Sequence, residues 1–286
     1  MDKFSELIYD VGRLWNAYAP SYLNGVKNTL ILAVVATLLG CVIGLICGVL
    51  NTIPIAANDS PAKRILLKFL RAVIRVYVEV FRGTPMVLQA VFIYYGLPYF
   101  TDGQVAFSGY SGMWLASILV VSINTGAYMA ESVRGGIISI DPGQTEGAKA
   151  IGMTHVQTMT HVIMPQIGNN FIINIKDTSV MFIIGFIEFF AVHRSVVGNN
   201  NLYFPSAIIE MVGYLTLTLI ASFLLRLVEK HMDGASSYEL AEVDSLTMAA
   251  GTYSHPDRGT PFDERNVEDM EKTRQSLKHG RNRGER

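Results

Sequence analysis

Charged side chains recur inside apolar stretches of this sequence, where they could bind a polar solute. Steps of three or four residues put one set of them on a single helix face. Within a membrane such residues are costly, and they usually face a partner or a water-filled path. A zwitterion that crosses a bilayer needs donors for its carboxylate and acceptors for its ammonium group, and this stripe supplies both. The stripe consists of Arg64, Lys68, Arg71, Arg75, Glu79 and Arg82.

The stripe has a second interpretation that the sequence leaves open. Glu79 follows Arg75 by one turn and precedes Arg82 by one turn, so the three could form an ion-pair ladder instead of lining a path. Glu188, near the outer end of another apolar stretch, could face a docked protein or the membrane interface. The residues that we predict for a translocation path are Arg75, Glu79, Gln89, Asn124, Glu131 and Glu188.

No catalytic or metal-binding pattern is apparent. The sequence has no G-x-x-x-x-G-K-[ST] phosphate loop, so a partner would have to hydrolyse any nucleotide. The six histidines lack metal-ligand spacing, and two cysteines cannot build a disulfide framework. We therefore expect a protein that is not an enzyme and carries no cofactor of its own.

The composition indicates a membrane protein. Half of the 286 residues are hydrophobic and 16% are charged, whereas soluble domains have about a quarter charged residues. A span needs roughly 20 apolar residues in a helix. We predict an all-α membrane protein with five transmembrane helices, and we expect 61–98 to form one long helix kinked near Gly83 and Pro85. The predicted spans are 26–50, 61–98, 113–128, 171–190 and 207–228.

The first predicted span carries small residues at every fourth position, Gly40, Gly44 and Gly48. Small residues at this spacing form a ridge that lets another helix approach closely in lipid. We therefore expect this face to pack against a second helix rather than against lipid.

Basic residues predict the orientation of the chain. Cytoplasmic loops carry an excess of lysine and arginine. The basic residues follow the first, third and fifth spans, which places the amino terminus outside and the carboxyl terminus in the cytoplasm. They are Lys63, Arg64, Lys68, Arg71, Arg134, Lys149, Arg226 and Lys230.

Three regions follow from this topology. Residues 1–23 are expected to be an extracytoplasmic segment, and 24–230 a transmembrane domain with a cytoplasmic loop at 136–168. The polar segment 231–286 is expected to be a disordered cytoplasmic tail.

Helix signals fill the loop between the third and fourth spans. Asp141, Pro142 and Gln144 match the start of a helix, which we expect over 142–151. Gly152 offers the left-handed conformation that ends helices. A second capping pattern at Thr154 predicts another helix that runs toward residue 165. The loop is thus expected to be a two-helix protrusion.

The loop resembles the EAA loop of importer-type ABC permeases. The sequence departs from that pattern at Gly147, where the family has alanine, and at Met164, where it has leucine. In the family, this loop docks on the cytoplasmic ATPase subunit and couples its closure to the spans. The residues that carry the resemblance, and to which it assigns ATPase coupling, are Glu146, Gly147, Ala148, Gly152, Ile163 and Pro165.

Further runs resemble the permeases for polar amino acids such as histidine, glutamine and arginine. These runs include RGTP at 82–85, ESVRGG at 131–136 and KDTS at 176–179. The resemblance implies a permease subunit in a bacterial plasma membrane, working with an ATPase dimer that binds ATP and Mg. It also implies a second permease subunit, the same chain or a related one, and an extracytoplasmic amino-acid-binding protein. Lipid is the remaining expected partner, and no nucleic acid is expected.

Two alternatives remain open at this point. An ion-coupled secondary carrier or a channel would explain the spans and their charges without an ATPase partner. A membrane scaffold or sensor that recruits a partner through its tail is the other. The carrier or channel does not account for the capped cytoplasmic loop, and deletion of the tail would test the scaffold or sensor.

Overall fold

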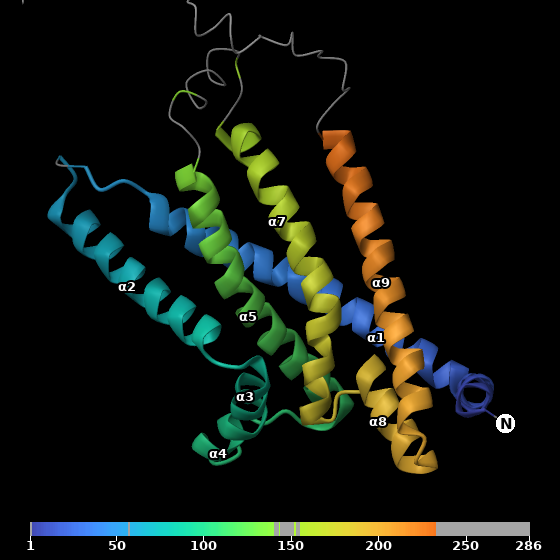
Figure 1. The fold of residues 1–286 in the computed structure, drawn as a ribbon. Helices are drawn as coiled ribbons and strands as arrows, with labels where there is room; N and C mark the ends of the chain where they lie inside the picture. The colour runs from blue at the N-terminus through green and yellow to red at the C-terminus, as the bar shows by residue number, and fades with distance from the viewer. Residues whose placement is uncertain (1, 57, 140–142, 144–151, 153–154, 233–286) are drawn as a thin grey trace, which may run out of the picture. The chain divides into compact units, whose positions relative to one another are not determined.

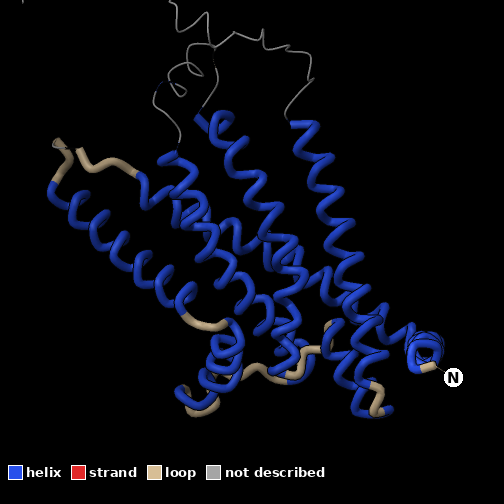
Figure 2. Tube along the Cα trace, viewed as in Figure 1, coloured by secondary structure: helices blue, strands red, loops and turns tan. Residues whose placement is uncertain are grey.

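The computed structural model describes residues 2–56, 58–139, 143, 152 and 155–232, and within them the chain forms helices and connecting loops without strands (Figure 2). The chain separates into two units, and all helices described below belong to the first, Met1–Asp233. Its α-helices are α1 (Lys3–Thr52), α2 (Pro61–Gly83), α3 (Met86–Val91), α4 (Leu97–Phe100), α5 (Gly109–Ser139), α7 (His155–Asp177), α8 (Phe189–Asn200) and α9 (Tyr203–Met232). A π-helical turn (Phe92–Gly96) joins α3 to α4, and a 3₁₀ helix (Thr178–Ile184) follows α7.

Three helices are each long and apolar enough to cross a membrane, namely α1, α5 and α9. Two bent pairs pass the same test together: α2 with Met86–Phe100, and Gln166–Ile184 with α8. The all-α membrane fold is thereby confirmed, with five spans if each bent pair counts as one. The pairs differ from straight spans because each contains a break in the helical backbone.

The glycine ridge of α1 packs against α5, as the spacing predicts (Figure 1). A Cβ at Gly40 would clash with the side chain of Thr125, and one at Gly48 with that of Val133. At Gly44 the added atom would overlap the Cβ of Met129. The two backbones approach so closely that only glycine fits at these positions.

The predicted single helix over 61–98 is wrong. The helix axis turns by 110° between α2 and the α3–α4 segment, so the two halves do not share a direction. Thr84 lies in extended conformation, with φ −119° and ψ 146°. A proline disfavours helical backbone in the residue before it and has no N–H to donate, so Pro85 ends the helix instead of kinking it.

The fourth predicted span also differs from the structure. Helix α7 is continuous from His155 through Pro165 to Asp177, and the chain then bends by 51° into α8. Gly185 permits this turn because its φ is +82°. Residues 191–200, which follow the predicted fourth span and were expected in a connection, are helical, since α8 extends to Asn200 and ends with Asn201 in left-handed conformation.

The structure describes the amino-terminal segment of the predicted domain layout but not its carboxyl-terminal tail from 233 on. Helix α1 begins at Lys3, so most of the segment expected before the first span is helical. Gly152 has a φ of +82°, which confirms its predicted left-handed conformation. The predicted helix over 142–151 and the tail from 233 lie outside the described residues, as do Glu146, Gly147 and Ala148.

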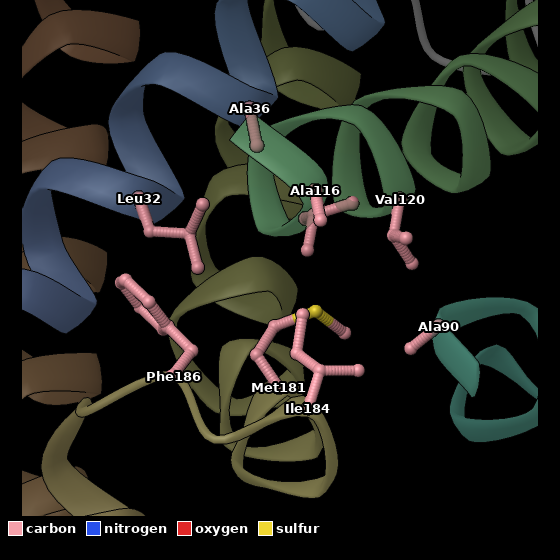
Figure 3. Close-up of a cluster of buried hydrophobic side chains, with 9 residues drawn as sticks. Leu32, Ala36, Ala90, Ala116, Val120, Met181, Ile184 and Phe186 are labelled. Carbon is pink, nitrogen blue, oxygen red and sulfur yellow. The ribbon is translucent and has the colours of Figure 1, made fainter. Parts of the chain in front are cut away.

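A buried apolar cluster joins the broken segments to the long helices (Figure 3). Its members come from α1, α3, α5, the 3₁₀ helix and the turn after it. They are Leu32, Ala36, Ala90, Ala116, Val120, Val121, Met181, Ile184 and Phe186. Because α3 and the 3₁₀ helix share this core, both breaks are held against α5.

Candidate functional site

A clamp of buried amides holds the break between α2 and α3. The Gln89 side-chain amide donates to the carbonyl oxygens of Phe81 and Thr84, each at 3.0 Å. Asn124 of α5 donates to the same Phe81 oxygen and to Gln89 Oε1, each at 3.1 Å. The break frees backbone carbonyls of α2 from helical hydrogen bonds, and in a membrane such groups need replacement partners. Gln89 and Asn124 supply them.

Replacing Gln89 by leucine should destabilise this break, because Leu has a similar size but removes the donor shared by the carbonyl oxygens of Phe81 and Thr84. The expected cost is roughly 1–3 kcal/mol. Thermal unfolding of the detergent-purified chain measures it as a lower midpoint. Leu88→Ala is the matched control, since Leu88 is 59% exposed and should leave the midpoint unchanged. If the unfolding midpoint of Gln89→Leu equals that of the parent, the hydrogen bonds of Gln89 do not stabilise the break.

A cavity of about 440 Å³ brings three of the predicted path residues together, Arg75 and Glu79 from α2 and Glu131 from α5. Arg134 donates to Glu131 through Nε at 3.1 Å. No ion pair joins Arg75, Glu79 or Arg82 to another residue of the described chain. Arg75, Glu79 and Arg82 therefore do not form an ion-pair ladder among the described residues. The lining residues are Asn51, Arg71, Arg75, Val78, Glu79, Arg82, Glu131 and Arg134.

A second cavity, of about 510 Å³, lies beside the 110° break and shares Arg82 with the first. The Arg82 guanidinium lies 5.4 Å from the ring centroid of Tyr128, a cation–π contact that orients it. Asp177 lines the same cavity, and no ion pair involves it among the described residues. The lining is Arg82, Gly83, Thr84, Pro85, Met86, Asn124, Thr125, Tyr128, Asn170, Ile173, Asn174 and Asp177.

Buried amides fix one wall of the second cavity. Asn174 of α7 donates to Thr37 Oγ1 of α1 at 2.7 Å, and its Oδ1 accepts from Thr125 Oγ1 of α5 at 3.1 Å. Asn170 donates to the carbonyl oxygen of Gln166 at 2.8 Å. The cavity thus combines one cation, one carboxylate and several amides, which is the inventory needed to bind a small zwitterion with a polar side chain.

The predicted path residues divide into three groups. Arg75, Glu79 and Glu131 line the first cavity and Asn124 the second, whereas Gln89 lines neither and acts at the break. Glu188 is fully buried and lines neither. The predicted path residues do not include Asp177, which lines the second cavity. It lies in the run KDTS at 176–179, one of the runs that resemble the permease family. Its position at a cavity depends on how α7 packs beside α2, α3 and α5, which the sequence pattern did not reveal.

Glu188 caps a helix instead of facing a partner. It is 0% exposed, and its two carboxylate oxygens accept from the backbone N–H groups of Phe190 and Ala191 at 2.8 and 2.6 Å. Tyr214 of α9 donates its hydroxyl at 2.9 Å. These bonds satisfy the first turn of α8 and tie it to α9. The expectation that Glu188 lies at an exposed outer interface is wrong for this unit.

The residues predicted to contact an ATPase lie largely outside the part of the chain that the structure describes. Gly152 is described and exposed, with no neighbouring atom within 4 Å of a Cβ built on it. Ile163 and Pro165 lie in the helical backbone of α7. Within the described residues, no group of three or more His, Cys, Asp or Glu could hold a metal ion.

A helical fold with up to five spans, and with charged cavities beside them, defines a multi-span membrane transport protein. Over residues 55–234 the sequence matches the family described as binding-protein-dependent transport system inner membrane component. The chain belongs to this family, and it is a permease subunit of an ABC-type importer in the inner membrane.

Relatives and solved structures agree with this membership. The chain is 34% identical over 233 residues to the glutamine transport system permease protein GlnP of Escherichia coli K12, covering 78% of this chain and 98% of that one. It is 30% identical to the probable amino-acid permease protein YxeN of Bacillus subtilis, covering 74% and 92%. The crystal structure of an amino acid ABC transporter with histidines is similar at 30% identity with a TM-score of 0.61, covering 75% and 95%. The MetNI methionine ABC transporter shares the fold at 17% identity and a TM-score of 0.54, covering 73% and 95%.

Proposed function

We propose that this permease subunit forms the translocation path for a polar amino acid and couples its movement to ATP hydrolysis on a separate subunit. The observation that carries the proposal is the second cavity, which presents Arg82 and Asp177 with neither residue in an ion pair within the described chain. The printed names of the relatives, which include glutamine and amino-acid permeases, point to the same substrate class.

The chemistry of this cavity fits an α-amino acid. A guanidinium forms strong, charge-assisted hydrogen bonds with a carboxylate, so Arg82 is suited to the substrate's carboxylate. Asp177 can accept from its ammonium group. The amide N–H groups of Asn124 and Asn170 are already engaged, and their side-chain oxygens could accept from a polar substrate side chain. A volume of about 510 Å³ is within the range of small-molecule sites.

The first cavity would continue the path from Arg82. Its lining has Arg75 and Glu79 on α2 and Glu131 on α5. Because charges of both signs line it, the same zwitterion would find partners at each stage. Gln89 serves the path indirectly, by holding the break at which the two cavities meet.

The orientation proposed is amino terminus outside and carboxyl terminus in the cytoplasm. Figure 1 shows that α2 begins, α5 ends, α7 begins and α9 ends toward one end of the described unit. Basic residues lie at these helix ends, including Lys63 in α2, Arg134 in α5 and Lys230 in α9. The positive-inside rule assigns that end to the cytoplasm. Residues 24–230 would then be the permease domain and 231–286 a cytoplasmic tail.

The assembly proposed has an ATPase dimer, which holds ATP and Mg, a second permease subunit and an extracytoplasmic binding protein. Contact with the ATPase is assigned to the loop at 136–168, through Glu146, Gly147, Ala148 and Gly152, with Ile163 and Pro165 in α7. The resemblance to the EAA loop supports this assignment. The loop joins α5 to α7, and both helices contribute residues to the second cavity.

Replacing Glu146 by lysine should uncouple transport from hydrolysis, because it places a cation where an acid is expected to meet the ATPase. Uptake into proteoliposomes is expected to fall to background while the purified chain still folds. Lys149→Gln is the control, since it changes charge in the same loop at a position outside the assigned set. Parent-level uptake and ATPase binding by Glu146→Lys would contradict the loop assignment.

The experiment that tests the proposed function is purification from the native membrane, followed by assays in liposomes. Recovery of an ATPase subunit, with hydrolysis stimulated by a binding protein and one polar amino acid, is the expected result and would name the substrate. Uptake driven by an ion gradient and indifferent to ATP would overturn the proposal in favour of an ion-coupled carrier.

A further inference from the structure

The first part of α1 cannot be explained as a membrane span. The helix has 50 residues, which at 1.5 Å each would reach about 75 Å, against about 30 Å for the hydrocarbon core. Pro20 lies inside it and lacks the N–H that a continuous helix would use. Figure 1 shows the helix viewed nearly end-on at the amino terminus, whereas the rest of α1 runs across the view. The amino-terminal part of α1 therefore points away from the axis of the span, and the residues before Pro20, 3–19, are called here the arm.

One side of the arm is packed against the protein. Leu14 is 1% exposed, and with Val11 and Tyr18 it joins a cluster that includes Val196 of α8 and Ile209 of α9. The Tyr18 hydroxyl accepts from the side-chain amide of Asn200 at 2.9 Å. These contacts fix the rotation of the arm about its own axis, so the same residues always face away from α8 and α9.

A second side of the arm is apolar and uncovered. Phe4, Ile8 and Trp15 are 66%, 56% and 43% exposed. They lie four and eleven residues apart, so they share one helix face, next to the packed side. The opposite side carries the charges, with an ion pair of 3.2 Å between Arg13 and Asp10. The charged residues of the arm are Lys3, Glu6, Asp10 and Arg13.

The uncovered face continues into the apolar surface of the spans. A groove of about 420 Å³ is lined by Trp15 and Leu23 of α1 together with Val212 and Thr216 of α9. Beyond it, Leu219 of α9 is 60% exposed. Since this part of α9 crosses the membrane, the face of the arm that carries Trp15 is continuous with a lipid-facing surface.

We propose that the arm is an interfacial helix that lies along the membrane surface, with Phe4, Ile8 and Trp15 in the boundary between headgroups and acyl chains. A helix with one apolar and one charged side inserts there to a depth of about 5–10 Å. Tryptophan favours the same zone. Two basic and two acidic side chains balance within the arm, so its partner is the lipid surface in general rather than an anionic one.

Tryptophan fluorescence of the full chain in lipid nanodiscs tests this placement. The sequence has two tryptophans, so the signal of Trp15 is the difference between the parent and Trp15→Phe. Lipids brominated near the headgroup end of the acyl chain should quench that signal more than lipids brominated near the methyl end. A water-soluble quencher such as iodide should have little effect.

Other occupants of this face give different results. Quenching by iodide and not by brominated lipid would place this face in water. That conclusion would hold even if an added binding protein then reduced the quenching by iodide. A signal shielded from both quenchers would indicate cover by a second protein chain. Either result would overturn the proposal. Exchanging Phe4 and Ile8 together for aspartate should abolish quenching by brominated lipid, whereas Asp10→Asn, on the charged side, should retain it.

Discussion

Replacing Gly44 by leucine is expected to reduce the folded permease in the membrane to a small fraction of the parent amount. A Cβ at this position would overlap that of Met129 and lie 3.0 Å from the backbone nitrogen of Ala130. The α5 backbone cannot move aside without disturbing the core cluster that it shares with α3. Even Gly44→Ala should cost roughly 1–3 kcal/mol, the usual range for an overpacked core.

The amount of monodisperse protein after detergent extraction, together with its thermal midpoint, measures this effect. Gly12→Ala is the matched control on the same helix, since no atom lies within 4 Å of a Cβ there. It should leave the midpoint unchanged or raise it slightly, because alanine favours helix over glycine by about 1 kcal/mol. Normal recovery of Gly44→Leu would mean that α1 and α5 do not pack as described.

Neutralising either charge of the second cavity should nearly abolish uptake while leaving the assembly intact. Arg82→Gln removes the cation that is expected to bind the carboxylate of the substrate. Asp177→Asn removes the carboxylate that is expected to accept from the ammonium group of the substrate. A lost hydrogen bond to a charged group costs roughly 1.5–3 kcal/mol, which corresponds to about a tenfold to hundredfold weaker binding. Initial uptake rates in proteoliposomes over a range of substrate concentrations measure the change.

The control for this pair is Lys176→Gln, which removes the charge next to Asp177 from an exposed side chain that does not line the cavity. Its uptake should match the parent's. The two cavity variants should still bind the ATPase and allow basal hydrolysis. Parent-level uptake by both would exclude the second cavity from the substrate path, even if ATP-driven import itself were established.

The sequence predicted what depends on local spacing. Periodic glycines identified the α1 face that packs on α5, and three- and four-residue steps identified the charged face of α2. Apolar length located the long helices α1, α5 and α9. Each of these signals lies within one helix, so no knowledge of neighbouring helices was needed.

The breaks were harder to predict because they depend on contacts from elsewhere in the chain. Pro85 signals a disturbance, but its 110° turn is stabilised by Gln89 and by Asn124 on another helix. Glu188 looks like an exposed acid in sequence, and its role as a cap requires α8, which apolar length alone did not reveal. Asp177 lines the second cavity together with residues of α2, α3 and α5, a grouping that spacing within one helix does not predict.

The hydrogen bonds of Asn174 join three helices at one level, since its amide contacts Thr37 of α1 and Thr125 of α5 from its own position on α7. Moving α7 past α1 or α5 would therefore break a buried hydrogen bond, so this junction resists displacement of the three helices relative to one another. Helix α2 is tied to the same level of α5, because Asn124, next to Thr125, donates to the carbonyl oxygen of Phe81. The break at Thr84 is thereby fixed to the junction, since Gln89 bonds both Thr84 and Asn124. The walls of the second cavity are thus hydrogen-bonded to one another across four helices, which gives the cavity a defined shape.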